Sequence, residues 1–195
     1  MVQRAVGTGS DLKPKGVLHR MTRPTFTVAH PITHRDALLR INLEYMSWVT
    51  AEIEKAFGVT TSDILGMPLP DYVAGAIDKV CGDAPPRGVF YLVERGGALA
   101  GMGGLRRVRD GVAEIKRLYV RPAHRGERLG ETVLQRLLGD ASGFGYSSVV
   151  LDSAPFMRSA QRLYEAAGFA DRVPYPETEV PPALHGTWRF MERAV

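Results

Sequence analysis

A glycine- and arginine-rich segment, Arg125–Gly130, has the residue types needed to bind a diphosphate. It reads Arg-Gly-Glu-Arg-Leu-Gly and lies between a run of strand-forming residues that ends at Val120 and a stretch with helical periodicity. Glycines let a backbone turn sharply and approach a ligand closely. The first amides of a helix have no partner within the helix, and the helix dipole adds positive potential there. The segment therefore predicts an anion site, although glycine turns before helices also occur without one.

Positive charge is concentrated around the same segment. Between positions 106 and 128, eight basic residues stand against three acidic ones. The basic residues are Arg106, Arg107, Arg109, Lys116, Arg117, Arg121, Arg125 and Arg128, and the acidic ones are Asp110, Glu114 and Glu127. Charge of one sign beside a glycine turn favours an anionic ligand, and a solvated basic surface is the alternative.

The composition is that of an ordinary globular protein, with 195 residues, 45% hydrophobic and 24% charged. Residues 1–24 are predicted to be a flexible extension, because glycines and prolines break every periodic pattern, and residues 25–195 are predicted to form one domain. No apolar run reaches the roughly 18 to 20 residues of a membrane helix, and no secretory signal is expected. Cys81 is the single cysteine, so no internal disulfide can form and we expect a cytoplasmic location.

The first third of the domain is predicted to be mainly helical. A short strand is expected at Thr25–Val28. Thr33 and Asp36 resemble a capping box that opens a helix, and the apolar spacing continues until Gly58. A second helix is expected at Asp71–Cys81, because its apolar residues share one face.

The remainder alternates between strand and helix patterns, and glycine turns separate the first strands. We expect strands at Gly88–Glu94, Ala98–Val108 and Val112–Val120, a helix over Leu129–Ala141, a strand at Ser148–Leu151, a helix from Pro155 to Gly168 and a strand at Trp188–Met191. The first three strands follow one another directly, which indicates antiparallel pairing. The fold class is therefore mixed α/β, with a central sheet flanked by helices.

Two stretches resemble the motifs of the GNAT (Gcn5-related) N-acetyltransferases. The first is Ala113–Pro122 followed by His124–Gly130, similar to the family's Leu-x-Val-x-Pro strand end and Arg/Gln-x-x-Gly-x-Gly/Ala turn. The second is Ala160–Phe169, at the family's spacing. The resemblance covers about Gly88 to Val195 and points to the small bacterial-type members. It implies the GNAT acyl-CoA N-acyltransferase fold, a mostly antiparallel sheet splayed between two strands.

The resemblance also implies that acetyl-CoA binds as cosubstrate in a V-shaped gap between the strand ending at Val120 and the strand Val149–Leu151, opened by a bulge. Main-chain groups near Leu118 and Val120 would pair with pantetheine, and the amides of Arg125 through Gly130 would hold the diphosphate. The implied cofactor-binding residues are Leu118, Tyr119, Val120, Arg125, Gly126, Glu127, Arg128, Leu129, Gly130 and Tyr164. No metal is expected, since the five histidines lack metal-ligand spacing.

The chain departs from the family pattern at two positions. Arg128 stands where the family usually has glycine, and Met157 stands where many relatives have asparagine. We expect the Arg128 side chain to fold over the diphosphate and add a charged contact. A side-chain contact to pantetheine is expected to be missing at Met157.

Three residues are candidates for the catalytic steps. Glu114 lies where several GNAT enzymes place a glutamate that acts as base directly or through water, and its alternative is an ion pair with Lys116 or a neighbouring arginine. Tyr164 matches the family tyrosine that acts as general acid near the CoA sulfur, and its alternative is a core aromatic residue. The amide of Val120 is the candidate donor to the oxyanion.

These observations favour an N-acetyltransferase that moves the acetyl group of acetyl-CoA to a primary amine by direct attack in a ternary complex. The alternative is a non-catalytic acyl-CoA-binding or regulatory module with the same fold. A basic nucleic-acid binder is a third interpretation, and nucleic acid and membrane are not expected partners. The acceptor stays open among small amines and protein N-termini, and a homodimer is left open because many relatives dimerise. The segments Val173–Pro176 and Glu179–Pro182 either wall the acceptor pocket or cross the surface.

Overall fold

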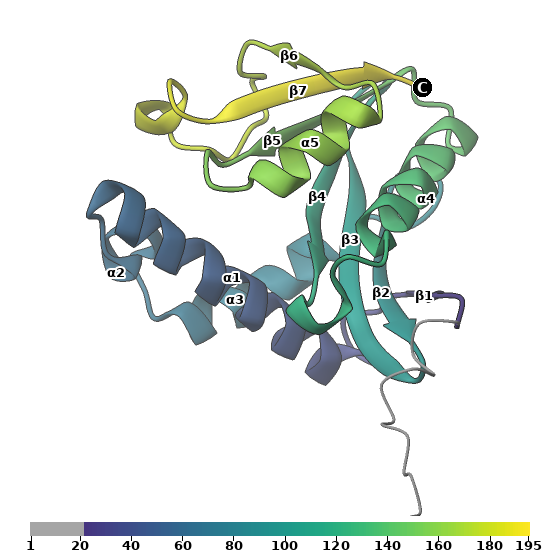
Figure 1. Ribbon diagram of the computed structural model, residues 1–195, viewed down its shortest axis with the longest axis horizontal. Helices are drawn as coiled ribbons and strands as arrows, with labels where there is room; N and C mark the ends of the chain where they lie inside the picture. Colours follow the sequence, from purple (N-terminus) through teal and green to yellow (C-terminus); the bar gives the residue numbers. More distant parts are fainter. Residues whose placement is uncertain (1–21) are drawn as a thin grey trace, which may run out of the picture.

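The computed structural model describes residues 22–195, so most of the predicted extension 1–24 lies outside the described residues. Figure 1 shows a central sheet with helices packed around it. The elements are β1 (Thr25–Val28), α1 (Arg35–Phe57), α2 (Thr61–Leu65), α3 (Leu69–Val80), β2 (Val89–Arg95), β3 (Ala98–Arg109), β4 (Val112–Val120), the 3-10 turn η2 (Pro122–His124), α4 (Leu129–Gly143), β5 (Ser148–Ser153), α5 (Arg158–Ala166), β6 (Ala170–Arg172), the 3-10 turn η3 (Pro182–Leu184) and β7 (Arg189–Ala194).

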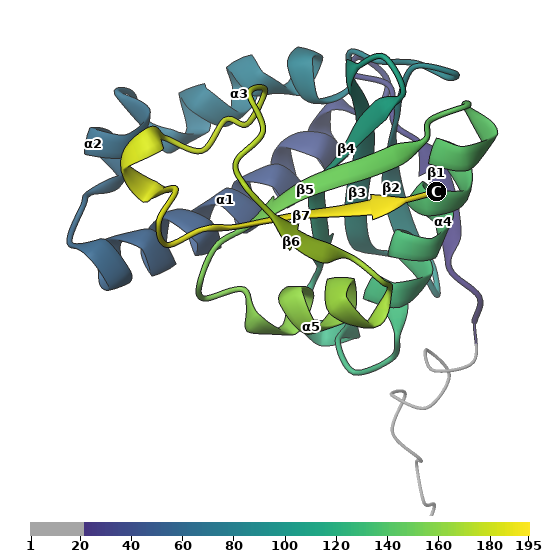
Figure 2. The ribbon, with the colours of Figure 1, turned by 90° about the horizontal axis from the view of Figure 1, so that it is seen from above.

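The sheet has the strand order β1-β2-β3-β4-β5-β7-β6. Its neighbours pair antiparallel except for β4 and β5, which are parallel because α4 carries the chain across between them. Figure 2 shows α1 and α3 on one side of the sheet and α4 and α5 on the other. The mixed α/β class and the mostly antiparallel sheet are therefore confirmed.

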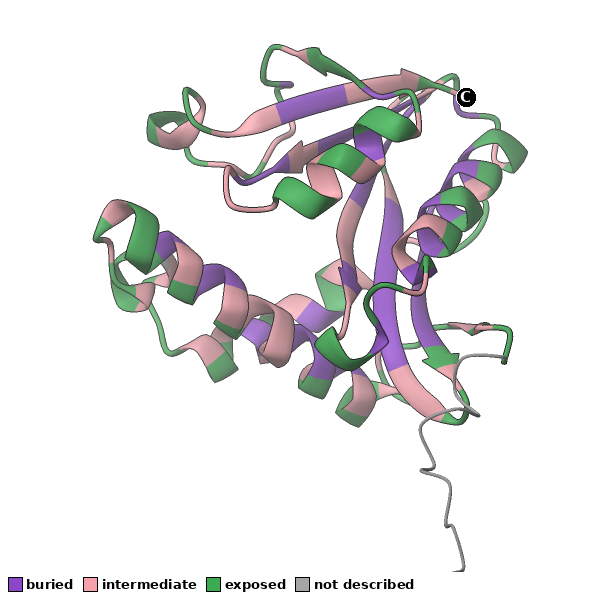
Figure 3. Cartoon of the chain, in the orientation of Figure 1, coloured by how far each residue is buried: buried purple, intermediate pink, exposed green. Residues whose placement is uncertain are grey.

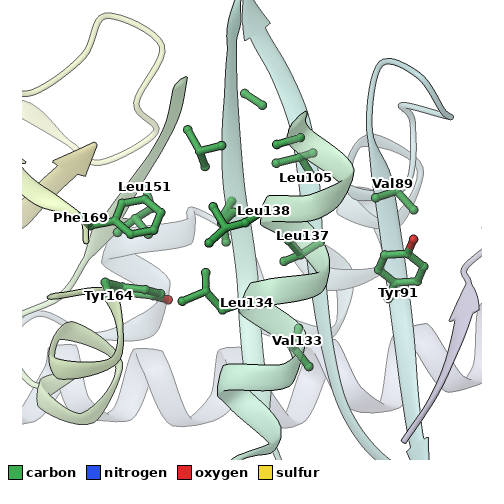
Figure 4. Close-up of a cluster of buried hydrophobic side chains, with 14 of the residues drawn as sticks. Val89, Tyr91, Leu105, Val133, Leu134, Leu137, Leu138, Leu151, Tyr164 and Phe169 are labelled. Carbon is green, nitrogen blue, oxygen red and sulfur yellow. The ribbon is translucent and has the colours of Figure 1, made fainter. Parts of the chain in front are cut away.

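Each face of the sheet has its own core, because successive strand residues point to opposite faces. On β2, Val89, Tyr91 and Val93 pack under α4, whereas Phe90 and Leu92 pack under α1 and α3. Figure 4 shows the α4 side chains stacked on the sheet beside α5. In Figure 3 the buried positions follow the centre of the sheet and the inner sides of the helices.

Two predicted helix starts were wrong. α1 has His34 at its N-cap with no side-chain capping bond, so Thr33 and Asp36 do not form the expected capping box. The reason is a turn before the helix, in which the His34 amide donates to the His30 carbonyl at 3.0 Å and the His34 ring accepts from the His30 amide at 2.9 Å.

The second difference is at α5, which begins at Arg158 rather than Pro155. The Met157 amide donates to the Ala154 carbonyl at 2.9 Å, and the Gln161 side chain donates to the same carbonyl at 2.7 Å. Pro155 therefore lies in a turn that precedes the helix. The short elements α2 and β6 were not predicted, since five and three residues carry little periodicity.

Candidate functional site

The central strands β4 and β5 separate part of the way along their length. They pair only where Val112–Glu114 meets Ser148–Val150. Beyond that point the pairing of β3 with β4 shifts register between Met102 and Gly104, and Arg117 has φ 54°, in the left-handed region. This is a β-bulge, which bends a strand and increases its twist. The predicted V-shaped gap and its bulge are present in the structure.

A cavity of about 650 Å³ occupies this gap, which is within the usual range for small-molecule sites. Its walls are the second half of β4, the segment after η2, the start of α4, one face of α5, and α1 with Tyr72 of α3. Figure 1 shows these elements converging where β4 leaves β5. The cavity therefore reaches from one face of the sheet to the other.

Five consecutive backbone amides face solvent or the cavity without an acceptor at the start of α4. None of the residues 22–195 accepts a hydrogen bond from the amides of Gly126–Gly130. Gly126 and Arg128 have φ 77° and 57°, and this pair of left-handed residues turns the chain into the helix. The Arg125 amide, which was also predicted to hold the diphosphate, is not free, because it donates to the Pro122 carbonyl at 3.2 Å. Consecutive free amides at a helix N-terminus form an anion-binding site.

The Arg128 side chain is not turned toward the diphosphate site as predicted. Its guanidinium donates two hydrogen bonds of 2.7 Å to Glu131, and the side chain is 80% exposed, so a phosphate contact would have to replace this pair. The left-handed φ of Arg128 explains why glycine suits this position. Glu127 pairs with Arg95 of β2 at 2.7 Å and does not line the cavity, which leaves only its amide for a ligand.

The end of β4 presents free main-chain groups to the gap. The Arg121 amide donates to the Ala100 carbonyl of β3 at 2.9 Å. Because alternate amides of a strand point in opposite directions, the Val120 amide points away from β3, toward the side where no strand pairs with it. The Val120 carbonyl accepts from the Arg125 side chain at 3.0 Å. Leu118, Tyr119 and Val120 all line the cavity.

Tyr164 of α5 is buried and lines the cavity. Figure 4 shows its ring between α4 and the neighbouring Phe169. None of the described residues hydrogen-bonds its hydroxyl. Burial raises the pKa of this hydroxyl, with smaller contributions from Tyr45 and Asp152, so the phenol stays protonated at neutral pH. The ring contributes to the core and its hydroxyl is also available to a ligand.

Glu114 is completely buried and does not line the cavity. Its carboxylate accepts from Arg106 at 2.5 Å, pairs with Lys116 at 3.2 Å and accepts a hydrogen bond from the Tyr175 hydroxyl. The alternative named for this residue, an ion pair with Lys116 or a neighbouring arginine, is therefore present. A base role in direct contact with an amine does not fit this position.

Asp152, at the end of β5, lines the cavity and shares the Tyr175 hydroxyl with Glu114. The Tyr175 hydroxyl lies 3.3 Å from it and hydrogen-bonds Glu114 as well, so one buried tyrosine joins the two acids. Burial, followed by the charges of Asp152 and Glu114, raises the pKa of Tyr175. Sequence reasoning missed Asp152, although an acidic residue directly after a buried strand was a usable signal.

Lys116 lies at the centre of this charged cluster. Its amino group is 3.2 Å from Glu114, 3.3 Å from Glu179 and 3.4 Å from Asp152. Burial lowers the pKa of Lys116, but the three negative charges outweigh it and leave the pKa above its usual value. Glu179 lines the cavity, so the proline-rich C-terminal segment walls this part of the site rather than only crossing the surface.

Aromatic side chains from α1, α3 and the turn before α5 form a further part of the cavity wall. Tyr45, Trp48, Tyr72 and Phe156 line the cavity. Trp48 contacts Phe156 edge-on at 5.7 Å between ring centroids, and Tyr45 lies 6.2 Å from Trp48. These residues were not singled out from the sequence, although Tyr45 and Trp48 share a face of the predicted helix at i, i+3 spacing.

The described residues show neither a metal site nor a membrane span. Across residues 22–195, no three His, Cys, Asp or Glu side chains are grouped as metal ligands. No helix in the same range is long and apolar enough to cross a bilayer.

Comparison with known proteins agrees with this architecture. The family model described as Acetyltransferase (GNAT) family matches residues 67–169. An uncharacterized N-acetyltransferase of Schizosaccharomyces pombe is 30% identical over 146 residues, covering 74% of this chain and 86% of that protein. A probable N-acetyltransferase family 8 member of Mus musculus is 31% identical over 153 residues, covering 73% of this chain and 67% of that protein.

A solved structure shares the fold at low identity. The PaiA N-acetyltransferase of Thermoplasma acidophilum, crystallised with coenzyme A, superposes with a TM-score of 0.64 at 16% identity, over 89% of this chain and 99% of that one. Together with the parted strands and the amide-lined turn, these similarities assign the chain: it belongs to the GNAT family of acetyltransferases and is an acyltransferase.

Proposed function

We propose that the protein transfers the acetyl group of acetyl-CoA to a primary amine in a ternary complex. The observation that carries this proposal is that one cavity holds three features together: the free amides of Gly126–Gly130, the unpaired edge of β4, and the side chains of Asp152 and Tyr164. The coenzyme A bound to the structural relative from T. acidophilum supports the choice of donor.

The residues present fit acetyl-CoA in two respects. The amides of Gly126–Gly130 would hold the diphosphate, and the main-chain groups of Leu118 and Val120 would pair with pantetheine as a neighbouring strand does. Arg125 lines this end of the cavity and would add positive charge. Acetyl-CoA, when bound, supplies the activated acetyl carbon.

Asp152 is the residue we place next to the amine. Most amines arrive protonated, and a carboxylate in the cavity can take up the proton that must leave before attack. Glu114 would act through Tyr175, whose hydroxyl contacts both carboxylates, and is therefore a positioning residue. In this proposal Asp152 takes the base role that was expected of Glu114, directly or through water, and Glu114 has the role that its enclosed position permits.

Tyr164 and Val120 complete the proposed mechanism. The Val120 amide, free on the gap side, would donate to the oxyanion that forms on the acetyl group. Tyr164 would donate its proton to the departing sulfur. A thiolate that leaves into the same buried surroundings is a stronger base than in water, which suits a phenol whose pKa is also raised.

The test combines calorimetry with a thiol-release assay. Titration with acetyl-CoA is expected to show binding, and an amine panel is expected to release free CoA thiol. Tyr164→Phe is expected to lower kcat by about 10²- to 10⁴-fold with little change in acetyl-CoA affinity. Tyr146→Phe is the matched control, since Tyr146 is also buried but bonds the Arg87 carbonyl far from the cavity.

A second set of variants distinguishes the role of Asp152 from that of Glu114. Asp152→Asn is expected to lower kcat by a similar factor with little change in acetyl-CoA affinity. Asp171→Asn is the control, because Asp171 pairs with Arg189 outside the cavity. Glu114→Gln is expected to shift the pH profile of kcat/KM while acetyl-CoA affinity is kept, and an unchanged profile would remove Glu114 from the mechanism. Acetyl-CoA binding without thiol release from any amine would instead favour the non-catalytic module.

A further inference from the structure

Arg117 is a cation in the cavity with no carboxylate partner among residues 22–195. Its guanidinium donates a 2.5 Å hydrogen bond to the side-chain oxygen of Asn42, and no described acidic residue pairs with it. The side chain is half-buried and lines the cavity. A partly desolvated charge without a counter-ion costs free energy, and a bound anion would recover it.

The other basic side chains near this end of the cavity are paired with carboxylates, whereas Arg125, at the α4 end, bonds the Val120 carbonyl. Arg106 pairs with Glu114 at 2.5 Å, Lys116 with Glu114 at 3.2 Å, and Arg121 with Glu44 at 2.7 Å. The cluster of positive charge noted in the sequence is thus mostly internal to the protein. Arg117 keeps an unneutralised guanidinium at the end of the cavity formed by α1 and α3.

Two features hold Arg117 in place. The Asn42 side chain is completely buried and donates from its nitrogen to the Leu38 carbonyl at 2.8 Å, which leaves its oxygen directed at Arg117. The bulge at Arg117, with φ 54°, puts it on the α1 face next to Lys116, whereas Leu118 packs against the core on the α4 face. A left-handed backbone at an arginine is uncommon and costs free energy, so the position is held by its surroundings.

Arg117, Asp152 and Tyr45 all line the cavity. Burial raises the pKa of Tyr45, and the opposed charges of Arg117 and Asp152 are the largest acting on its hydroxyl. Tyr45 belongs to the aromatic wall with Trp48 and Phe156. An anion site, a site for the amine and an apolar surface therefore lie together on the acceptor side.

We infer that the acceptor is an amine that also carries a carboxylate and an apolar or aromatic side chain, a free amino acid or a close analogue, with its carboxylate on Arg117. This inference rests on the proposed transferase function. In it, the planar guanidinium forms charge-assisted hydrogen bonds with the carboxylate. Asp152 receives the amino group, and the side chain packs on Trp48 and Phe156.

The experiment measures thiol release with matched acceptor pairs: phenylalanine, leucine and tryptophan, each against its carboxamide, with phenethylamine as the amine that lacks the group altogether. Because hydrogen bonds to charged groups are among the stronger ones, kcat/KM for the acids is expected to exceed that for the amides by about 10- to 100-fold. Arg117→Gln is expected to bring this acid-to-amide ratio close to one. Calorimetry with acetyl-CoA checks that the variant is folded.

Arg107→Gln is the control variant. Arg107 carries the same charge on the adjacent strand β3, pairs with Asp110 and does not line the cavity, so its removal is expected to keep the ratio. Amides or phenethylamine used as well as the acids would overturn the acceptor class while leaving the transferase function standing. A ratio that survives in Arg117→Gln would overturn the role of Arg117. No thiol release from these compounds, when other primary amines of the panel do release thiol, would overturn the acceptor class alone, and no release from any amine would overturn the proposed function as well.

Discussion

Gly130, in the first turn of α4, is a position where alanine is expected to raise stability and a longer side chain is expected to weaken acetyl-CoA binding. A Cβ added there would lie 3.5 Å from a methyl of Leu163, 3.8 Å from Val120 and 4.0 Å from Leu118. These are ordinary van der Waals distances, so alanine fits without a clash. Its backbone is helical rather than left-handed, so no strain opposes the change.

For the free protein, Gly130→Ala is expected to be stabilising. Replacing glycine by alanine within a helix contributes about 0.5–1 kcal/mol, because glycine loses more backbone entropy on folding. For a domain of this size that corresponds to a rise in Tm of roughly 2–4 °C per kcal/mol. Thermal melting without ligand measures it.

For binding, the family motif has glycine or alanine at this position, so a longer side chain is needed to test the path. In Gly130→Leu the side chain would stand between α5 and the free edge of β4, where we place the acetyl-CoA chain. Overfilling a close-packed site typically costs about 1–3 kcal/mol, so the acetyl-CoA affinity of Gly130→Leu is expected to fall roughly 5- to 150-fold. Calorimetry measures this loss.

Gly139→Ala and Gly139→Leu are the matched controls. Gly139 lies in the same helix, is exposed, and has no atom within 4 Å of an added Cβ. Gly139→Ala is expected to show the same gain in stability, and Gly139→Leu is expected to leave acetyl-CoA affinity unchanged. If Gly130→Leu bound acetyl-CoA as tightly as the unmodified protein, the gap beside Gly130 would not be the binding path. A loss of stability confined to Gly130→Ala would contradict the packing argument.

Two further predictions follow from shifted pKa values. Burial raises the pKa of Cys81 to about 11 from its usual 9.0. Its alkylation by iodoacetamide is therefore expected to be about tenfold slower at pH 8 than that of an ordinary thiol, and the alkylation rate is expected to keep rising above pH 9. A rate that levels off by pH 9 would contradict this. Burial raises the pKa of Glu179, but the charge of Lys116 and the contacts with Lys79 and Arg106 outweigh it and leave the pKa at about 2. Because the folded pKa lies below the usual 4.5, Glu179 stabilises the fold above that pH and loses this effect as the pH falls toward 2. Glu179→Gln is therefore expected to lower the urea midpoint slightly at pH 7, by no more than a partly exposed ion pair is worth, and the difference should shrink on acidification; a difference independent of pH would refute it.

Local patterns predicted most of the elements because those patterns reflect the sheet and the helices directly. The β-branched and aromatic residues of Val89–Val93 and the glycine turns after Arg95 and at Gly111 specify two hairpins with little help from distant residues. The apolar stripe of α4 has the same origin. Boundaries failed at Thr33 and Pro155, where backbone turns outside the helix took up the groups that a capping pattern would use.

The anion-binding turn was also accessible from the sequence, since unpaired amides at a helix start are a local property. The sequence did not show which amides and side chains of the turn stay free to bind an anion. The Arg125 amide donates to the Pro122 carbonyl, and the Arg128 guanidinium pairs with Glu131, because each of these groups has a closer partner once the turn is folded. Sequence alone shows that Arg128 replaces glycine but not where its guanidinium lies.

The sequence by itself determined a mixed α/β chain with a helix N-terminus suited to phosphate, because hydrophobic period, turn residues and free helix amides are set within a few neighbouring positions. Only the tertiary structure decided which acidic and basic side chains line the cavity and which are buried or paired. It enclosed Glu114 behind Tyr175, exposed Asp152 to the cavity and left Arg117 without a counter-ion. Burial and charge pairing of these groups depend on strands and loops far apart in the chain, and no local pattern records which partners will meet.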